Sequence, residues 1–324
     1  MMPDHAALTT APDNLGHHDG RFMRWFNMRG WASMTIGAPY VWLLVLFLVP
    51  FIIVVGMSFA LRTPTSPPFS FGRDGSFLSL TNYARLFQDD LYIRAFLTSL
   101  KNAGFATILC LLIGYPMALG LTRVSRSARN ILLMLVILPF WTSFLLRVYA
   151  WIGLMGNNSW FNKLLTGAYN AVVPQAWELH SIQLMNTNFA VILVTVYSYL
   201  PFMILPLYAN LEKLDLTLNE AAMDLGSRPF RVFLDVTLPM SMPGIIAGGL
   251  LVFIPASGEL IIPGLVGNPS QPMIGRVISD EFASSRDWPM ASAVAVALLL
   301  LLVVPMMLYT HFEAKAQERK AMEP

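Results

Sequence analysis

Two ionisable side chains, Arg147 and Glu259, lie inside long apolar stretches of this 324-residue chain. A charge within an apolar membrane helix is costly, so such a residue is by default a functional candidate. If these stretches cross a membrane, Arg147 lies about seven residues from one end of its span, or roughly 10 Å deep at 1.5 Å per residue. Glu259 is expected at a similar depth, where a carboxylate could hold a cation.

Structural explanations of the two charges stand beside this functional one. Arg147 could extend its long side chain to the membrane interface. Glu259 could pair with Arg147, or bind backbone groups freed by Pro255 or Pro263. Nearby aromatic rings attract ammonium groups by about 0.5–2 kcal/mol, but they also mark membrane interfaces. The candidate path residues are Glu259, Arg147, Trp141, Tyr149 and Tyr197.

Other chemistry is missing from the sequence. It contains neither G-x-S-x-G nor H-E-x-x-H, and no G-x-x-x-x-G-K-[ST] phosphate loop. Cys110 is the single cysteine, and of the five histidines only His17 and His18 are adjacent. We therefore expect no catalytic residue, no cofactor and no metal site. If ATP drives this protein, another chain must bind it, and the net charge of +2 suggests no nucleic-acid partner.

A charged, turn-rich stretch, "NEAAMDLGSRPF" at 219–230, interrupts this apolar chain. Thr217 and Glu220 form a capping-box pattern at the start of a short helix. Gly226 suits the left-handed position that ends such a helix. Ser227 can then cap the next turn, and Pro229 suits its beginning.

This short helix has a shallow apolar face at helical spacing, made of Leu218, Ala221, Ala222 and Leu225. Such a face could be approached closely by the surface of another protein. It could equally be a membrane-proximal connector that packs on its own bundle. The residues of this face are compatible with both possibilities.

Six segments reach the roughly 20 apolar residues that a membrane helix requires. Charged residues make up only 12% of the chain, and hydrophobic residues 56%. The sequence therefore predicts an all-α membrane protein with six transmembrane helices, each containing proline. "GIIAG" (244–248) is a GxxxG pattern, which favours close helix packing. The predicted spans are 39–60, 97–121, 131–154, 187–210, 244–266 and 289–311.

The basic residues favour an orientation with both termini in the cytoplasm. That side would hold twelve arginines and lysines outside the spans, against seven on the other side. Loop 122–130 carries three arginines and no acid, while residues 1–20 lack the features of a signal peptide. In the outer loops, a short helix start is expected at "SLTNYARLF", an interfacial segment at "SWFNKLL" and an amphipathic turn at "MIGRVISDEFASSRDWP".

The stretch that begins at Glu220 resembles the "EAA" loop of permease subunits of ABC importers. Glu220-Ala221-Ala222 is followed after three residues by Gly226, and nine residues later by Val236, one residue and Leu238-Pro239. Val236 replaces the usual isoleucine. Over 35–312 the chain is similar to the putrescine/spermidine branch, through "LLIGYPMA", "RNILLMLVILPFWTSFLLRVYAW", "GELIIPGLVG" and "MIGRVISDEFASSRDWPMASAVAV".

The resemblance implies a type I ABC importer permease-like bundle in a bacterial inner membrane, with a cytoplasmic coupling helix. It implies as partners a cytoplasmic ABC ATPase dimer, a second, different permease subunit and a periplasmic polyamine-binding protein, besides membrane lipid. The expected parts are a disordered cytoplasmic tail (1–37), a permease domain (38–312, with coupling loop 211–243) and a cytoplasmic tail (313–324). The expected ATPase-coupling residues are Glu220, Ala221, Ala222, Gly226, Leu238 and Pro239.

Two alternatives remain at this stage. A secondary transporter coupled to protons or sodium often shows repeats and membrane-embedded carboxylates, whereas only Glu259 is an acid deep in a span here. An ABC permease for another substrate, such as iron, sulfate or an amino-acid derivative, would have similar spans.

Overall fold

A computed structural model describes residues 19–71, 79–174, 177, 179–215 and 217–322. The chain divides into two units, Met1–Gly56 and Met57–Pro324. Side chains of residues 19–36, 304–305 and 308–324 are outside the description.

The first unit holds most of α1, Asp19–Ser58, a helix of 40 residues with Pro39 and Pro50 inside it. Its part from Gly37 to Ser58 is long and apolar enough to cross a membrane. Residues 1–18 of the expected disordered tail (1–37) lie outside the described residues. From Asp19 onward the chain is described as helix.

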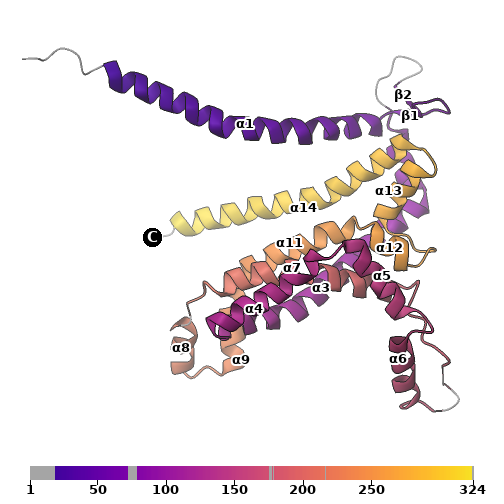
Figure 1. Ribbon diagram of the computed structural model, residues 1–324. Coiled ribbons are helices and arrows are strands. Elements are labelled where there is room, and N and C mark those ends of the chain that lie inside the picture. The colour runs from indigo at the N-terminus through magenta and orange to yellow at the C-terminus, as the bar shows by residue number, and fades with distance from the viewer. Residues whose placement is uncertain (1–18, 72–78, 175–176, 178, 216, 323–324) are drawn as a thin grey trace, which may run out of the picture. The chain divides into compact units, whose positions relative to one another are not determined.

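The second unit is a helical bundle built on α3, α7 and α11 (Figure 1). α3 (Asp90–Arg123) and α7 (Asn188–Leu211) are long apolar helices that each meet the length of a membrane span. α11 (Met242–Ser257) packs against both. Figure 1 shows α8 and α9 at one end of this bundle, called the α8 end here, and α12 and α13 at the other, called the α13 end.

Small residues allow α11 to lie against α7. A Cβ atom on Gly244 would come within 2.8 Å of Asn210 Cβ, and one on Gly248 within 2.8 Å of Met203 Sδ. The two helix backbones can approach closely only because both positions lack a side chain. The packing role predicted for "GIIAG" is confirmed.

Two predicted spans are not continuous helices. The third consists of α4 (Arg126–Ile137), a 3-10 turn (Leu138–Trp141) and α5 (Phe144–Met155), with a bend of 90°. The fifth stops at Ser257 and resumes as α12 (Ile261–Val266). Pro139 lies in the 3-10 turn of the third span, where it cannot continue the helix hydrogen bonds. Among the described residues, three helices can cross a membrane, or up to five if two bent pairs each count as one span; these pairs are Arg126–Trp141 with Phe144–Met155, and Pro229–Met240 with Met242–Ser257.

The sixth predicted span lies in α14, Trp288–Met322, of which Trp288–Val303 forms a shorter apolar helix. The short helix expected at "SLTNYARLF" is present as α2 (Thr81–Gln88). The expected interfacial segment and amphipathic turn also form helices, α6 (Trp160–Asn170) and α13 (Ile274–Ala283). A two-stranded antiparallel hairpin, β1 (Leu61–Arg62) with β2 (Phe69–Ser70), was not predicted. The remaining helices, α8 to α10, form the segment described next.

Candidate functional site

The short helix predicted from "NEAAMDLGSRPF" is α8, Thr217–Asp224. Its first amide, on Thr217, donates to Asp215 Oδ1 at 3.0 Å. Hydrogen bonds from the backbone and from the side chain of Thr217 hold the pKa of the Asp215 carboxyl below its usual value. Asp215 is thus the cap, and the predicted capping box of Thr217 and Glu220 is not among the described hydrogen bonds.

α8 ends in a Schellman motif around Gly226. This glycine has φ of +84°, its N–H donates to Met223 O at 2.9 Å, and the Ser227 N–H donates to Ala222 O at 3.1 Å. These two bonds satisfy carbonyls that the end of the helix leaves free. The left-handed conformation predicted for Gly226 is confirmed.

The apolar face of α8 is uncovered in this chain. Leu218 is 44% exposed and Leu225 88% exposed, and Ala221 between them is exposed as well. Phe230, just beyond the Schellman motif, is 72% exposed. Apolar side chains gathered on a short helix outside the bundle indicate a surface that another molecule covers.

Behind α8 the chain returns to the bundle through three short helical pieces. α9 (Pro229–Val232) has Pro229 in its first turn, as predicted, although Arg228 rather than Ser227 occupies the N-cap position. A π-helical turn follows at Phe233–Thr237, and then α10 at Leu238–Met240. The coupling candidates Leu238 and Pro239 thus lie in α10, directly before a 64° bend into α11.

A cavity of about 780 Å³ lies between this segment and the neighbouring ends of α3, α4 and α7. Glu220 lines it from α8 and Phe233 from the π-helical turn. Arg129 lines it from α4, and its Nη1 is 2.7 Å from Glu212 Oε1 at the end of α7. Its Nε and Nη2 donate to the carbonyls of Leu121 and Thr122 at the end of α3. One arginine therefore joins three helix ends beside α8.

Glu259 occupies the break between α11 and α12. Its side chain is buried, and Oε1 accepts hydrogen bonds from the amides of Ile261 at 3.0 Å and Ile262 at 3.4 Å. Oε2 accepts a hydrogen bond from the Tyr199 hydroxyl on α7. The carboxylate therefore caps the start of α12, where the first amides of the helix have no partner within the helix.

Arg147 lies near the start of α5 and is 9% exposed. Its guanidinium carbon is 5.7 Å from the centre of the Phe140 ring and 5.5 Å from that of Phe144. Its Nε and Nη1 have no hydrogen-bond partner among the described atoms. The pairing of Arg147 with Glu259 considered above is not among the ion pairs of the described residues.

A row of aromatic rings lies between the two charges. Tyr199 is 6.0 Å from Phe202, and Phe202 is 5.0 Å from Phe140, as measured between ring centres. The guanidinium of Arg147 lies over the Phe140 ring. The phenylalanines of this row did not appear among the sequence candidates, because contacts between separate helices leave no periodic signal in one sequence.

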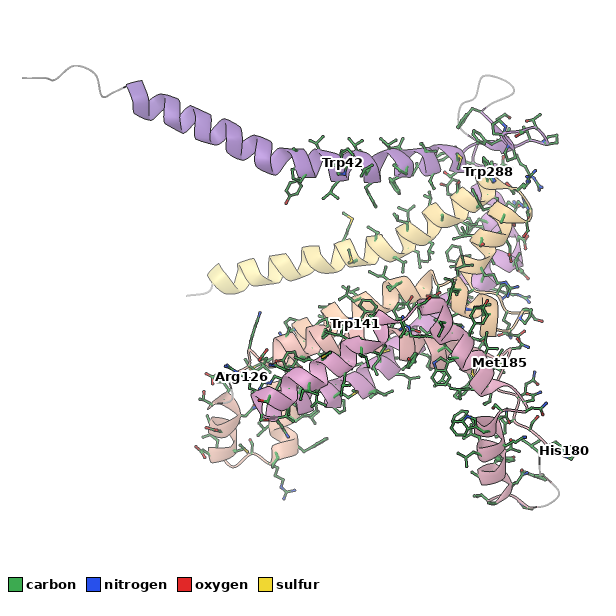
Figure 2. The ribbon with its side chains drawn as sticks, in the orientation of Figure 1. Trp42, Arg126, Trp141, His180, Met185 and Trp288 are labelled. Carbon is green, nitrogen blue, oxygen red and sulfur yellow. The ribbon has the colours of Figure 1, made fainter. Side chains whose placement is uncertain are left out.

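The three predicted aromatic path residues differ in their surroundings. Tyr197 packs edge-on against Trp151, with ring centres 5.6 Å apart. Trp141 lies at the junction before α5 (Figure 2) and is 76% exposed, and Tyr149 is 58% exposed. Trp141 and Tyr149 thus lie on the surface of this chain, where lipid or another subunit would cover them.

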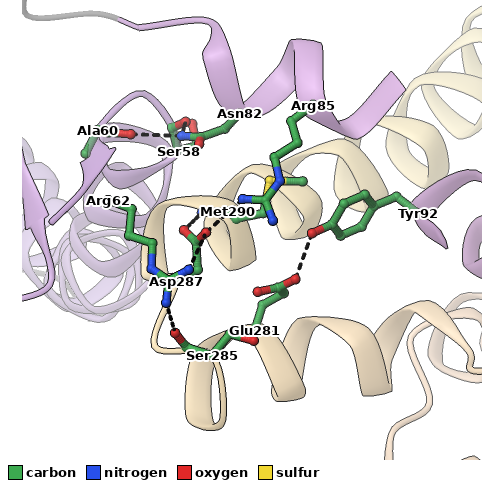
Figure 3. Close-up of polar contacts among 10 residues, drawn as sticks. All are labelled: Ser58, Ala60, Arg62, Asn82, Arg85, Tyr92, Glu281, Ser285, Asp287 and Met290. Carbon is green, nitrogen blue, oxygen red and sulfur yellow. Dashed lines mark hydrogen bonds and ion pairs between the residues drawn. The ribbon is translucent and has the colours of Figure 1, made fainter. Parts of the chain in front are cut away.

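A second polar cluster lies at the α13 end and was not predicted (Figure 3). Asp287, only 1% exposed, is 3.1 Å from Arg85 and 3.8 Å from Arg62, and it accepts the Met290 amide. Although burial acts against the charged form, Tyr92 and Asp287 raise the pKa of Arg85. Asp287 lies about 200 positions from Arg85, so local sequence patterns give no sign of this cluster.

The Asp287 cluster extends to α3 and the hairpin. Tyr92 donates to Glu281 at 2.7 Å, and Asn82 donates to the carbonyls of Ser58 and Ala60. The bonds of Asn82 link α2 to Ser58 and Ala60, and the bond of Tyr92 links α3 to Glu281 of α13. They fix the loops at this end of the bundle.

Long apolar helices, a bundle with broken spans and an uncovered short helix define a polytopic membrane protein. The family described as "Binding-protein-dependent transport system inner membrane component" matches residues 110–318. The chain therefore belongs to this family of membrane transport components.

Relatives of known name cover most of the chain. The spermidine/putrescine transport system permease protein PotB of Haemophilus influenzae is 40% identical over 277 residues, which cover 86% of this chain and 92% of that protein. PotB of Escherichia coli is 37% identical over 286 residues, covering 87% and 97%. A bacterial ABC transporter involved in alginate import has the same fold, with a TM-score of 0.66, 16% identity and coverage of 91% and 99%.

Proposed function

We propose that this chain is a permease subunit of an ABC importer that carries polyamines, with putrescine and spermidine as substrates. The substrate class is supported by the spermidine/putrescine permeases, to which this chain is 37–40% identical over most of its length. The resemblance adds a cytoplasmic ATPase dimer, a second, different permease subunit and a periplasmic polyamine-binding protein. The chain would supply half of the translocation path and no ATP-binding site.

The uncovered apolar face of α8 is the observation that supports coupling of this chain to an ATPase. Leu218, Ala221 and Leu225 are exposed on a short helix that is capped at both ends and returns to the bundle through α9 and α10. Such a helix can enter a cleft of an ATPase subunit without unfolding. We assign α8 as the coupling helix, with Glu220, Ala221, Ala222 and Gly226 at its docking surface and Leu238 and Pro239 behind it.

The topology follows from this assignment. α8 would lie in the cytoplasm, and Figure 2 places Arg126 at the same end of the bundle, with Met185 and Trp288 at the opposite end. Six spans with both termini in the cytoplasm agree with the excess of basic residues on that side. α1 and α14 would then supply the first and sixth spans.

For the substrate path we assign Glu259 and the aromatic residues near it, with Arg147 as a second electrostatic element. A cation passing Glu259 meets a carboxylate already bonded to two amides and one hydroxyl. Its attraction is therefore weaker than that of a bare carboxylate, which suits a transport site that must release its cargo. Trp141, Tyr149 and Tyr197 remain proposed members of this path.

The test is uptake into liposomes that contain the full complex with its ATPase and binding protein. Radiolabelled putrescine and spermidine should accumulate only when ATP is present on the ATPase side, and a proton uncoupler should not abolish uptake. Uptake that needs no ATPase and collapses with the uncoupler would support an ion-coupled transporter instead. Calorimetry of the purified binding protein with putrescine, spermidine and spermine then tests the substrate class separately.

A further inference from the structure

The bend between α10 and α11 is held by one buried serine. Ser241 is fully buried, its N–H donates to Thr237 O at 3.0 Å, and its hydroxyl donates to Leu238 O at 2.9 Å. The direction of the chain changes by 64° at this residue. Ser241 thus lies where the segment behind α8 becomes a helix of the bundle.

Tyr115 of α3 contacts both sides of this bend. Its hydroxyl is 2.9 Å from Ser241 Oγ, and its ring meets that of Phe233 edge-on at 5.5 Å between centres. A serine hydroxyl has one hydrogen, which Ser241 gives to Leu238 O. Tyr115 is therefore the donor and Ser241 the acceptor. Tyr115 is 93% buried, so water does not compete freely for this bond.

The same segment is tied to α8 by a second bond. Thr237 Oγ1 donates to Asn219 Oδ1 at 3.3 Å, from the last residue of the π-helical turn to the middle of α8. Asn219, Thr237, Ser241 and Tyr115 thus form a continuous hydrogen-bonded path from the exposed helix to the bundle, through the bond from Ser241 N–H to Thr237 O.

Both helices joined by this path are irregular at the point of contact. Pro116, next to Tyr115, removes one helix hydrogen bond of α3. On the other side, the Leu238 N–H bonds Phe233 O five residues back, which is a π-helical turn of the kind often found at functional sites. Interrupted helices bend more readily than regular ones. A displacement of α8 can therefore bend the chain at Pro116 of α3 and at the π-helical turn.

We propose that Tyr115 and Ser241 are positioning residues that transmit movement of the coupling helix to α3 and α11. This inference rests on the proposed function, because it takes α8 as the element that the ATPase moves. Loss of the bond leaves α8 free to bind the ATPase, but its movement no longer reaches α3 with the same geometry. ATP hydrolysis then continues, but less substrate is transported for each ATP hydrolysed.

The experiment compares Tyr115→Phe, Ser241→Ala and the double variant in the reconstituted complex with its ATPase and binding protein. The measured quantity is the amount of putrescine or spermidine transported per ATP hydrolysed. Each single variant should lower this ratio roughly three- to tenfold, as expected for one buried hydrogen bond. The double variant should lose no more than the larger single effect, because both changes break the same bond. Thr237→Val breaks the path at its α8 side and should give the same uncoupling.

Thr107→Val is the matched control on α3. Its hydroxyl donates to Ala103 O within the same helix, so its loss removes a hydrogen bond without touching the path. The ratio should stay at the wild-type value. Unchanged ratios in Tyr115→Phe and Ser241→Ala, or additive losses in the double variant, overturn the inference while leaving the proposed function intact. A wild-type complex without ATP-driven uptake overturns the proposed function, and this inference with it.

Discussion

Tyr199 donates its phenolic hydrogen to the carboxylate of Glu259, which caps α12 through its other oxygen. One buried acid thus joins α7 to the break of the fifth predicted span. The two explanations considered for Glu259, a structural role and a role in the substrate path, are therefore not exclusive. A carboxylate held in place by three donors is a fixed charge, and a fixed charge can act on a passing cation.

Substitutions at Glu259 separate these two roles. Glu259→Ala leaves two amides and a hydroxyl without their acceptor and should destabilise the protein by about 1–3 kcal/mol. Glu259→Gln keeps an oxygen for the amides, so its thermal unfolding temperature in detergent should fall less. It removes the charge, however, and should lower polyamine uptake. Wild-type uptake in Glu259→Gln would leave this residue with a structural role alone.

Arg147 provides the control for that experiment. Arg147 lies over two phenylalanine rings, and no ion pair joins it to Glu259 among the described residues. Adding Arg147→Gln to Glu259→Gln should therefore not restore uptake. Recovery in the double variant would mean that the two charges compensate one another.

Gly226 should tolerate asparagine but not valine. No atom lies within 4 Å of the position of a Cβ atom there, so the cost comes from the backbone at φ of +84° alone. A β-branched residue in this conformation costs about 1–2 kcal/mol, whereas asparagine adopts it more readily. Gly226→Val should weaken co-purification of the ATPase subunit, and Gly226→Asn should retain it. Equal retention in both variants would contradict the Schellman motif as a requirement for docking.

Gly244 and Gly249 of α11 are a matched pair of positions for testing how closely α11 packs against α7. A Cβ atom on Gly244 would lie 2.8 Å from Asn210 Cβ, but one on Gly249 would find its nearest neighbour at 3.9 Å. Gly244→Ala should destabilise the protein by about 1–3 kcal/mol through overpacking, and Gly249→Ala should be close to neutral. The two unfolding temperatures in detergent give the comparison. Similar values for both would place α11 farther from α7 than described.

Local signals in the sequence were sufficient for the end of α8 and the start of α9. A glycine at a left-handed position and a proline at N1 act within a few residues, so Gly226 and Pro229 could be predicted. The apolar length that marks a span also predicted α3 and α7. The size of the 90° bend before α5 could not be predicted, because prolines indicate a kink without fixing its angle.

Contacts between distant segments account for what the sequence did not indicate. Asp287 and Arg85 meet across about 200 positions, and Tyr199 reaches Glu259 across 60. Each such pair depends on how whole helices pack. The cap on α8 is a different case, because it is local: Asp215 and Thr217 both carry suitable oxygens, and the sequence pattern favoured the wrong one.

The six-span topology is tested with single cysteines. Cys110 is fully buried and is the only cysteine, so Cys110→Ala provides an unreactive background. Ser127 in the arginine-rich loop and Ser270 near the α13 end are both exposed and serve as reporters. A membrane-impermeant maleimide should label Ser127→Cys only from the cytoplasm and Ser270→Cys only from outside. Ser227→Cys should behave like Ser127→Cys. Ser76, the other external position of interest, lies outside the described residues. Labelling of Ser127→Cys and Ser270→Cys from the same side would exclude six spans, because an odd number of crossings must separate these two positions.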